Sequence, residues 1–147
     1  MTLSIGSDHA GFAYKEALKA MLIADGHDVI DVGTHSTEST DYPDYGVAAA
    51  RLVQNGTAEF GVLVCGSGIG IAMAADKVKG IRAANCTSVE MARLARMHNN
   101  ANMVAVGERL VSEELAKEIV RTFLSTPFEG GRHERRVAKI HTLGDIG

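Results

Sequence analysis

The sequence contains little cysteine and no tryptophan. Two cysteines, Cys65 and Cys86, occur among 147 residues. Two are too few for the disulfide framework of a small secreted domain, so the core must hold the fold together. A chain of this length can bury such a core without disulfides or a structural metal. We therefore expect one domain over residues 1–147 in a reducing, cytoplasmic compartment, where a free thiol can work.

Long apolar runs and a strong charge imbalance are absent as well. The uncharged apolar stretches are far shorter than the roughly 20 residues that cross a bilayer. The N-terminal sequence MTLSIGSDHAG leads straight into a strand and a turn, and it lacks the features of a basic, apolar leader. The formal net charge of −3 argues against nucleic acid as the main partner. We expect neither a membrane nor a nucleic acid as a partner.

Positive charge is concentrated in one segment near the C-terminus. Residues 132–139, RHERRVAK, include three arginines and one lysine. A helix there would place Arg132 and Arg136 one turn apart on the same face. Guanidinium groups are permanently charged and bind in a bidentate manner, which suits a phosphate dianion. An anionic ligand is therefore expected to meet this end of the chain.

Short apolar runs alternate with helical patterns along the whole sequence. This alternation indicates a parallel sheet with right-handed crossovers and helices on both faces. We predict a doubly wound α/β fold, which is a three-layer αβα sandwich, Rossmann-like, with a five-stranded parallel sheet and a C-terminal helix. The expected strands cover 3–7, 28–32, 60–65, 80–86 and 103–106, and the expected helices cover 12–25, 44–55, 71–77, 88–96 and 113–124.

One stretch suggests chemistry. Residues 62–75, VLVCGSGIGIAMAA, run from a buried strand through a glycine-rich turn into a helix. Free backbone N–H groups of such a turn form an anion cradle at the helix N-terminus. Cys65 ends the strand beside this cradle, where a helix N-terminus favours the thiolate form. The turn therefore fits a thiolate next to an oxyanion site. Its residues are Gly66, Ser67, Gly68 and Gly70.

Other interpretations of the turn leave residues unexplained. A dinucleotide fingerprint needs a glycine where Ile71 stands, and a Walker loop needs a Gly-Lys-Ser/Thr that is absent. A thiol redox protein would normally carry a second cysteine at CxxC spacing. The histidines and cysteines show no zinc-ligand spacing, so we expect neither a metal nor a cofactor. A binding module for nucleotides or phosphosugars explains the cradle, but it leaves Cys65 and His98 without a role.

The expected topology places polar residues at two opposite edges of the sheet. Asp8 and His9 follow the first strand, Cys65 ends the third, and Arg109 follows the fifth. Ligands of doubly wound sheets bind at these carboxyl ends. His98 instead precedes a strand, at the other edge. If His98 and Cys65 serve one site, the simplest arrangement is a homodimer, or a tetramer of such dimers, whose sites are completed across the interface.

A polar loop connects the second strand to the second helix. Residues 33–45, GTHSTESTDYPDY, are rich in hydroxyl groups, and long irregular loops in compact domains tend to be functional. Pro43 fixes the turn, so the ring of Tyr42 can form the wall of a pocket. We expect Asp44 to cap the following helix.

Five motifs occur in order: SDHAG at 7–11, TDYPDY at 40–45, CGSGIGIAMAADK at 65–77, HNN at 98–100 and EGGRHERRV at 129–137. With them the chain resembles, over essentially its whole length, the sugar-phosphate isomerases of the ribose-5-phosphate isomerase B and galactose-6-phosphate isomerase type. The resemblance implies an aldose–ketose interconversion through a cis-enediol, without metal or cofactor. It also implies a place in the pentose phosphate pathway.

The resemblance implies roles for individual residues. Cys65 corresponds to the base that moves a proton between C1 and C2, while Ser67 and the turn amides hold the enediolate. His98 corresponds to the group that helps open the furanose ring, and Asp8 corresponds to its assistant. The residues implied in binding sugar hydroxyls and phosphate are His9, Asn99, Arg109, Arg132 and Arg136.

The expected substrate pair is ribose 5-phosphate and ribulose 5-phosphate. A single chain with Cys65 and both C-terminal arginines resembles a self-sufficient enzyme, whereas the galactose 6-phosphate enzymes resemble a pair of different subunits. Six-carbon substrates such as allose 6-phosphate or galactose 6-phosphate, and a phosphosugar module that only binds, remain the alternatives.

Overall fold

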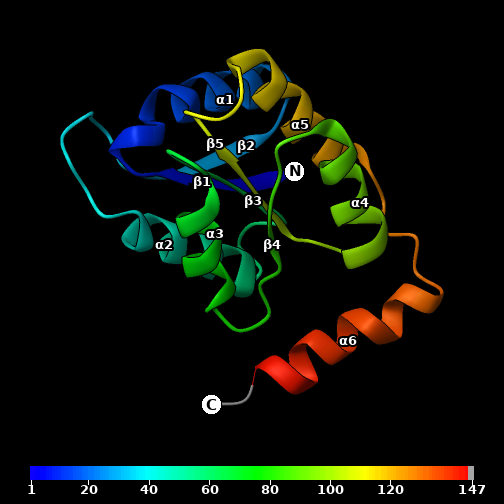
Figure 1. Cartoon of the computed structure of the whole chain (residues 1–147). Helices are drawn as coiled ribbons and strands as arrows, with labels where there is room; N and C mark the ends of the chain where they lie inside the picture. Colours follow the sequence, from blue (N-terminus) through cyan, green and yellow to red (C-terminus); the bar gives the residue numbers. More distant parts are fainter. Residues whose placement is uncertain (146–147) are drawn as a thin grey trace.

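The computed structural model describes residues 1–145, and Figure 1 shows strands alternating with helices along them. The strands are β1 (Thr2–Ser7), β2 (Asp28–Gly33), β3 (Phe60–Cys65), β4 (Ala83–Asn85) and β5 (Met103–Gly107). The helices are α1 (Phe12–Ala24), α2 (Tyr42–Gln54), α3 (Ile69–Asp76), α4 (Val89–Asn99), α5 (Glu113–Ser125) and α6 (Arg132–Gly144), with a short 3₁₀ turn at His9–Gly11. None of the helices within residues 1–145 combines the length and the apolar character needed to cross a bilayer.

All five strands are parallel and form one sheet in the order β2-β1-β3-β5-β4. The predicted five-stranded parallel sheet of an α/β sandwich is confirmed. The central strands β1, β3 and β5 are almost fully buried along their length. Strands covered by helices on both faces are expected to be this apolar.

Two apolar clusters fill the two faces of the sheet. One includes Leu18 of α1 and Phe123 of α5, and the other includes Ala49 of α2 and Ile71 of α3. Figure 1 shows α1 and α5 on one side of the strands and α2 and α3 on the other. The helices after β1 and β3 thus lie on opposite faces, so the loops that follow these neighbouring strands diverge. Such a switch point opens a crevice at the carboxyl ends of the strands.

The second helix begins earlier than predicted. α2 starts at Tyr42, and its N-cap is Asp41, whose side chain makes no capping hydrogen bond. Pro43 is tolerated in the first turn because the backbone N–H it lacks would have no partner there. Asp44 lies inside that first turn, where its charge suits the helix N-terminus. The prediction that Asp44 caps the helix is therefore wrong.

Two further boundaries differ from the prediction. The edge strand β4 covers only Ala83–Asn85 of the expected 80–86. Just before it, the backbone N–H of Arg82 donates to the side chain of Asn102 and not to the backbone of a neighbouring strand. α4 continues to Asn99 instead of ending near 96, and Asn100 ends it in a left-handed conformation with φ of 46°. His98 therefore lies in the last turn of α4.

Helix α6 lies at the end of the molecule, beside α4 and away from the sheet (Figure 1). His133 and Val137 are its buried residues, while Arg132 and Arg136 are exposed on it, as a C-terminal helix with both arginines predicts. Leu143 exposes 69% of its surface. A helix with exposed apolar side chains and few partners in its own chain is suited to contact another molecule.

Candidate active site

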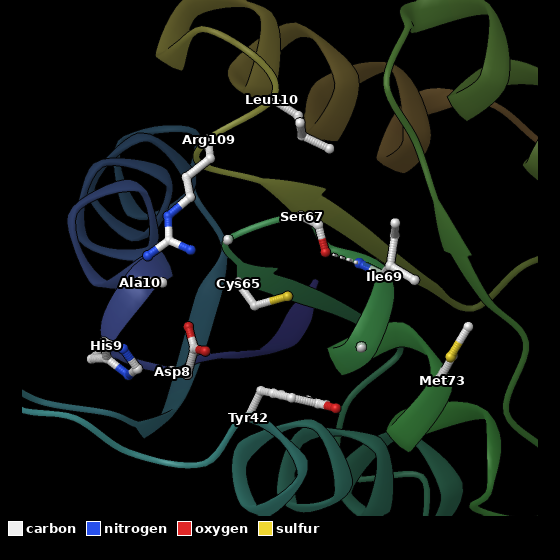
Figure 2. Close-up of a pocket in the computed structure, with 12 residues that line it drawn as sticks. Asp8, His9, Ala10, Tyr42, Cys65, Ser67, Ile69, Met73, Arg109 and Leu110 are labelled. Carbon is white, nitrogen blue, oxygen red and sulfur yellow. Dashed lines mark hydrogen bonds between the residues drawn. The ribbon is translucent and has the colours of Figure 1, made fainter.

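A cavity of about 590 Å³ opens at the carboxyl ends of β1, β3 and β5. Figure 2 shows Cys65 at its floor, with side chains from three loops and from α2 and α3 around it. This is the crevice expected at the switch point between β1 and β3. The lining residues are Asp8, His9, Ala10, Tyr42, Cys65, Gly66, Ser67, Ile69, Gly70, Met73, Arg109 and Leu110.

The glycine-rich turn holds the thiol against the start of α3. The backbone N–H of Gly68 donates a hydrogen bond to the Sγ of Cys65 at 3.1 Å, which fixes the position of the sulfur. Gly68 has φ of +79°, and an added Cβ would lie 2.6 Å from the Oδ1 of Asn85. Only glycine fits this position, because both the dihedral angle and the space exclude a side chain.

Ser67 occupies the outer side of the same turn. Its hydroxyl oxygen accepts a hydrogen bond from the backbone N–H of Ile69 at 3.1 Å, which Figure 2 marks with a dashed line. This bond leaves the hydroxyl proton of Ser67 available to another acceptor. α3 begins at Ile69, earlier than the predicted residue 71, so the free N–H groups of its first turn adjoin the cavity.

Asp8 follows β1 and is nearly enclosed, with 6% of its surface exposed. Its Oδ1 accepts a hydrogen bond from the backbone N–H of Gly11 at 3.1 Å, so it caps the 3₁₀ turn before α1. Figure 2 shows its carboxylate on the cavity side of β1, close below Cys65. Asp8 therefore has a structural contact and a place in the cavity at the same time.

The polar loop after β2 fixes His9. The backbone N–H of Thr40 donates to Nδ1 of His9 at 3.1 Å, and the backbone N–H of His9 donates to the hydroxyl of Thr40 at 3.1 Å. Nδ1 of His9 also lies 3.2 Å from the carbonyl oxygen of Thr40. In the tautomer in which Nδ1 accepts from the Thr40 N–H, the ring proton is on Nε2. That nitrogen can then donate to an anionic ligand in the cavity.

Arg109 reaches the cavity from the end of β5. Its backbone N–H donates to the carbonyl oxygen of Gly66 at 3.0 Å, and the N–H of Glu108 donates to that of Cys65 at 3.0 Å. These bonds attach the loop after β5 to the thiol-bearing turn. Figure 2 shows the guanidinium group extending over the cavity toward Ala10. A cation is thus placed near the donors of His9 and of the turn.

The side chain of Tyr42 forms one wall of this cavity. A Cβ added to Gly70 would lie 2.7 Å from the ring of Tyr42, so the ring packs directly on the first turn of α3. Tyr42 as a whole is 41% exposed. Glycine at 70 allows this close approach of an aromatic side chain to the helix backbone.

The sequence model of the Ribose/Galactose Isomerase family matches residues 3–140. The chain belongs to this family. The expectations that it resembles this family and that it is an enzyme of the sugar-phosphate isomerase type are confirmed.

Relatives within the Ribose/Galactose Isomerase family match almost the whole chain. Ribose-5-phosphate isomerase B of Escherichia coli K12 is 46% identical over 141 residues, which are 96% of this chain and 95% of the relative. The structure of ribose-5-phosphate isomerase B from Clostridium thermocellum is 49% identical with a TM-score of 0.97, covering 99% of this chain and 98% of that one. The Mycoplasma genitalium enzyme with bound ribulose 5-phosphate is 38% identical with a TM-score of 0.93, covering 99% and 97%.

Four residues that the resemblance to the Ribose/Galactose Isomerase family selects lie away from the cavity. His98, in the last turn of α4, stacks on His133 of α6 with ring centroids 4.3 Å apart. Asn99 lines a second cavity of about 390 Å³ beneath α6. Arg132 and Arg136 are exposed on α6. One chain of this family member therefore does not bring these residues to Cys65.

Sequence reasoning missed the environment of His98. His133 is 6% exposed, and its pKa is lowered, mainly by burial and further by His98 and Arg132.

The second cysteine, Cys86, differs from Cys65 in its environment. Burial raises the pKa of Cys86 to about 11. Cys86 therefore stays a thiol at neutral pH, whereas Cys65 lines the cavity.

Proposed function

We propose that the protein interconverts ribose 5-phosphate and ribulose 5-phosphate through a cis-enediol, with Cys65 as the base. The observation that carries this proposal is the hydrogen bond from the Gly68 N–H to the Sγ of Cys65, inside a cavity with anion donors. The family relatives named for this reaction, one of them with bound ribulose 5-phosphate, support the choice of substrate.

The proton transfer follows from the geometry of the turn. The thiolate of Cys65 removes the proton from C2 of the open-chain aldose, and negative charge develops on the oxygen at C1. The hydroxyl of Ser67 and the free N–H groups at the start of α3 are the donors for that oxygen. One such donor lowers the barrier by about 3 to 4 kcal/mol. The thiol then returns the proton to C1, while the hydroxyl proton at the C2 oxygen is transferred to the negative oxygen at C1. The products are the C2 ketone and the C1 hydroxyl of the ketose.

The substrate phosphate is proposed to bind between His9, Arg109 and the two arginines of α6. Binding energy from a group remote from the reaction holds the reacting carbons in place. Arg132 and Arg136 are exposed and do not line the cavity of their own chain. They are therefore proposed to reach the cavity of a second copy of the chain, together with Asn99.

A homodimer, alone or within a tetramer, also accounts for His98. Ring opening needs a proton donor or acceptor at the furanose oxygen, and His98 with Asp8 is proposed to supply it. Apolar side chains at the rim of the cavity support a subunit interface there: Met73 is 64% exposed, Leu110 is 58% exposed and Ile69 is 45% exposed. Exposed apolar groups of this kind are often covered by a partner. A cytoplasmic location remains a prediction.

The substrate assignment is tested by steady-state kinetics with three sugar phosphates. We expect kcat/KM for ribose 5-phosphate to exceed the values for allose 6-phosphate and galactose 6-phosphate. A preference for a six-carbon sugar would move the chain to the hexose branch. Binding of all three without turnover would favour a module that only binds.

A further inference from the structure

Three potential metal ligands meet where the last turn of α4 faces the start of α6. They are His98, Glu129 and His133, and their ligand atoms all lie within 4.8 Å of one another. None of them lines the cavity that contains Cys65. Two imidazoles and one carboxylate form a donor set that suits zinc and similar divalent ions.

The buried imidazole in this cluster has no hydrogen-bond partner among the described residues. His133 is 6% exposed, and its Nε2 is buried and makes no hydrogen bond within residues 1–145. The nearest carboxylate oxygen, Oε1 of Glu129, is 3.8 Å away, too far for a hydrogen bond. Leaving such a group unpaired costs about 1 to 3 kcal/mol, so buried polar atoms normally have a partner. An ion bound to Nε2 would supply one.

Backbone hydrogen bonds place residue 129 beside α4 without help from a ligand. The N–H of Glu129 donates to the carbonyl oxygen of Met97 at 3.0 Å, and the N–H of His133 donates to that of Gly130 at 3.1 Å. Gly130 and Gly131 have φ of +72° and +57°, which turns the chain sharply between the two ligands. Metal sites depend on this kind of preorganisation.

We propose that His98, Glu129 and His133 bind one divalent transition-metal ion, such as Zn²⁺, with water completing the coordination. The rings of His98 and His133 are nearly parallel, at 16°, so their nitrogen lone pairs do not yet converge. The ring of His98, which is less buried than His133, turns about its Cβ–Cγ bond to meet the ion. The neighbouring Arg132 weakens cation binding, so affinity falls below that of a structural zinc site.

Binding at this cluster has a functional consequence, which rests on the proposed function. An ion that occupies His98 removes it from ring opening, so Zn²⁺ acts as an inhibitor. Inhibition is then stronger with cyclic ribose 5-phosphate than with a substrate that needs no ring opening. Ion binding itself does not depend on the proposed reaction.

Binding is tested by isothermal titration calorimetry of ZnCl₂ into full-length, chelator-treated and desalted protein. We expect one ion per chain. Glu129→Gln and His133→Asn should each weaken Zn²⁺ binding by at least about tenfold, the smallest loss of metal affinity that is typical when a group supporting a metal site is removed. Glu129 is exposed, so its variant keeps the fold even if the buried His133 variant does not. The matched controls are Glu134→Gln on α6 and His35→Asn on the loop after β2, and both should bind as wild type does.

Equal affinities in wild type, ligand variants and controls would show adventitious binding and overturn the site, as would the absence of binding heat. Initial rates with and without Zn²⁺ then separate the two proposals. Binding that depends on Glu129 but leaves the rate unchanged would keep the metal site and contradict the role of His98 in ring opening. Inhibition that Glu129→Gln relieves supports both.

Discussion

The backbone N–H of Gly68 lies 3.1 Å from the Sγ of Cys65 and points its hydrogen at the sulfur. The same glycine is the N-cap of α3, and the N–H groups in the first turn of a helix have no partner within that helix. Thiol and oxyanion donors are thus held by one short segment. A base and the donors that stabilise its product need this fixed relation, because a misplacement of about 1 Å can cost a hundredfold in rate.

The two cysteines should differ in reactivity. Cys65 lines the cavity, while burial raises the pKa of Cys86 to about 11. Because the thiolate is the reactive form, iodoacetamide at pH 8 should modify Cys65 first. Mass spectrometry of peptides after a short exposure measures this. Ribose 5-phosphate should protect Cys65, and preferential labelling of Cys86 would contradict the assignment.

Gly68→Ala should disrupt the turn. Alanine at this position would have to adopt φ of +79°. Its Cβ would lie 2.6 Å from Asn85 Oδ1 and 2.9 Å from the Val106 backbone. We expect a loss of stability well above the roughly 1 to 2 kcal/mol of the dihedral angle alone, together with a large loss of kcat.

Gly80→Ala is the matched control for this variant. Gly80 has φ of +86°, and no atom of residues 1–145 lies within 4 Å of an added Cβ. The expected cost of this variant is therefore that of the dihedral angle. Urea unfolding and steady-state kinetics of both variants measure the difference. Equal effects of the two substitutions would show that the contacts around Gly68 are not required.

A buried ion pair should contribute to stability. Lys15 is fully buried, and its Nζ lies 2.6 Å from Asp31, which Lys19 also contacts at 3.1 Å. Burial raises the pKa of Asp31, but hydrogen bonds from Lys15, the Gly33 N–H and Lys19 outweigh it, and the net pKa is lowered. Lys15→Met should therefore destabilise the fold at pH 7 by about 3 kcal/mol, the lower end for a broken buried pair.

The pH dependence of this penalty has a defined sign. Because the native pKa of Asp31 is lowered, its stabilisation is present above its unfolded pKa of about 3.9 and is lost as pH falls through the native pKa. The difference in unfolding free energy between wild type and Lys15→Met should narrow as the pH falls. Lys19→Met, with a more exposed ammonium group, should cost up to about 1 kcal/mol. A Lys15→Met penalty that is constant from pH 7 to pH 3 would contradict this account.

Mixed subunits test whether two chains build one site. Cys65→Ala and His98→Asn subunits should each have little activity on ribose 5-phosphate. If each site takes Cys65 from one chain and His98 from the other, half of the sites in a mixed dimer are intact. Random exchange should then restore about one quarter of wild-type activity. No recovery, with exchange proven by native mass spectrometry, would place both residues in one subunit's site.

Part of this site could be predicted from the sequence because topology alone places it. Residues that follow parallel strands meet at one edge of the sheet. The strand order was therefore enough to predict that Asp8, Cys65 and Arg109 line one cavity. The helical position of His98 was missed because Asn100, not a glycine, ends α4. The start of α2 at Tyr42 was not predicted because Pro43 suits a loop as well as a first helical turn.

The cluster around His133 could not be predicted in this way. Its ligands come from the end of α4 and from the segment before and inside α6, and no short spacing joins His98 to Glu129. Their contact depends on how α6 packs beside α4, and the buried residues of α6 are His133 and Val137. A search for neighbouring ligands along the sequence does not detect a site made by tertiary packing.

The central claim is that Cys65 moves the proton. We would follow ribose 5-phosphate in D₂O by NMR with wild type and Cys65→Ala, in the presence of a chelator. The account predicts ribulose 5-phosphate and deuterium at C2 of the aldose with wild type, and neither with Cys65→Ala, although the variant still binds the phosphate. Exchange and turnover by Cys65→Ala at a near wild-type rate would show that another group is the base.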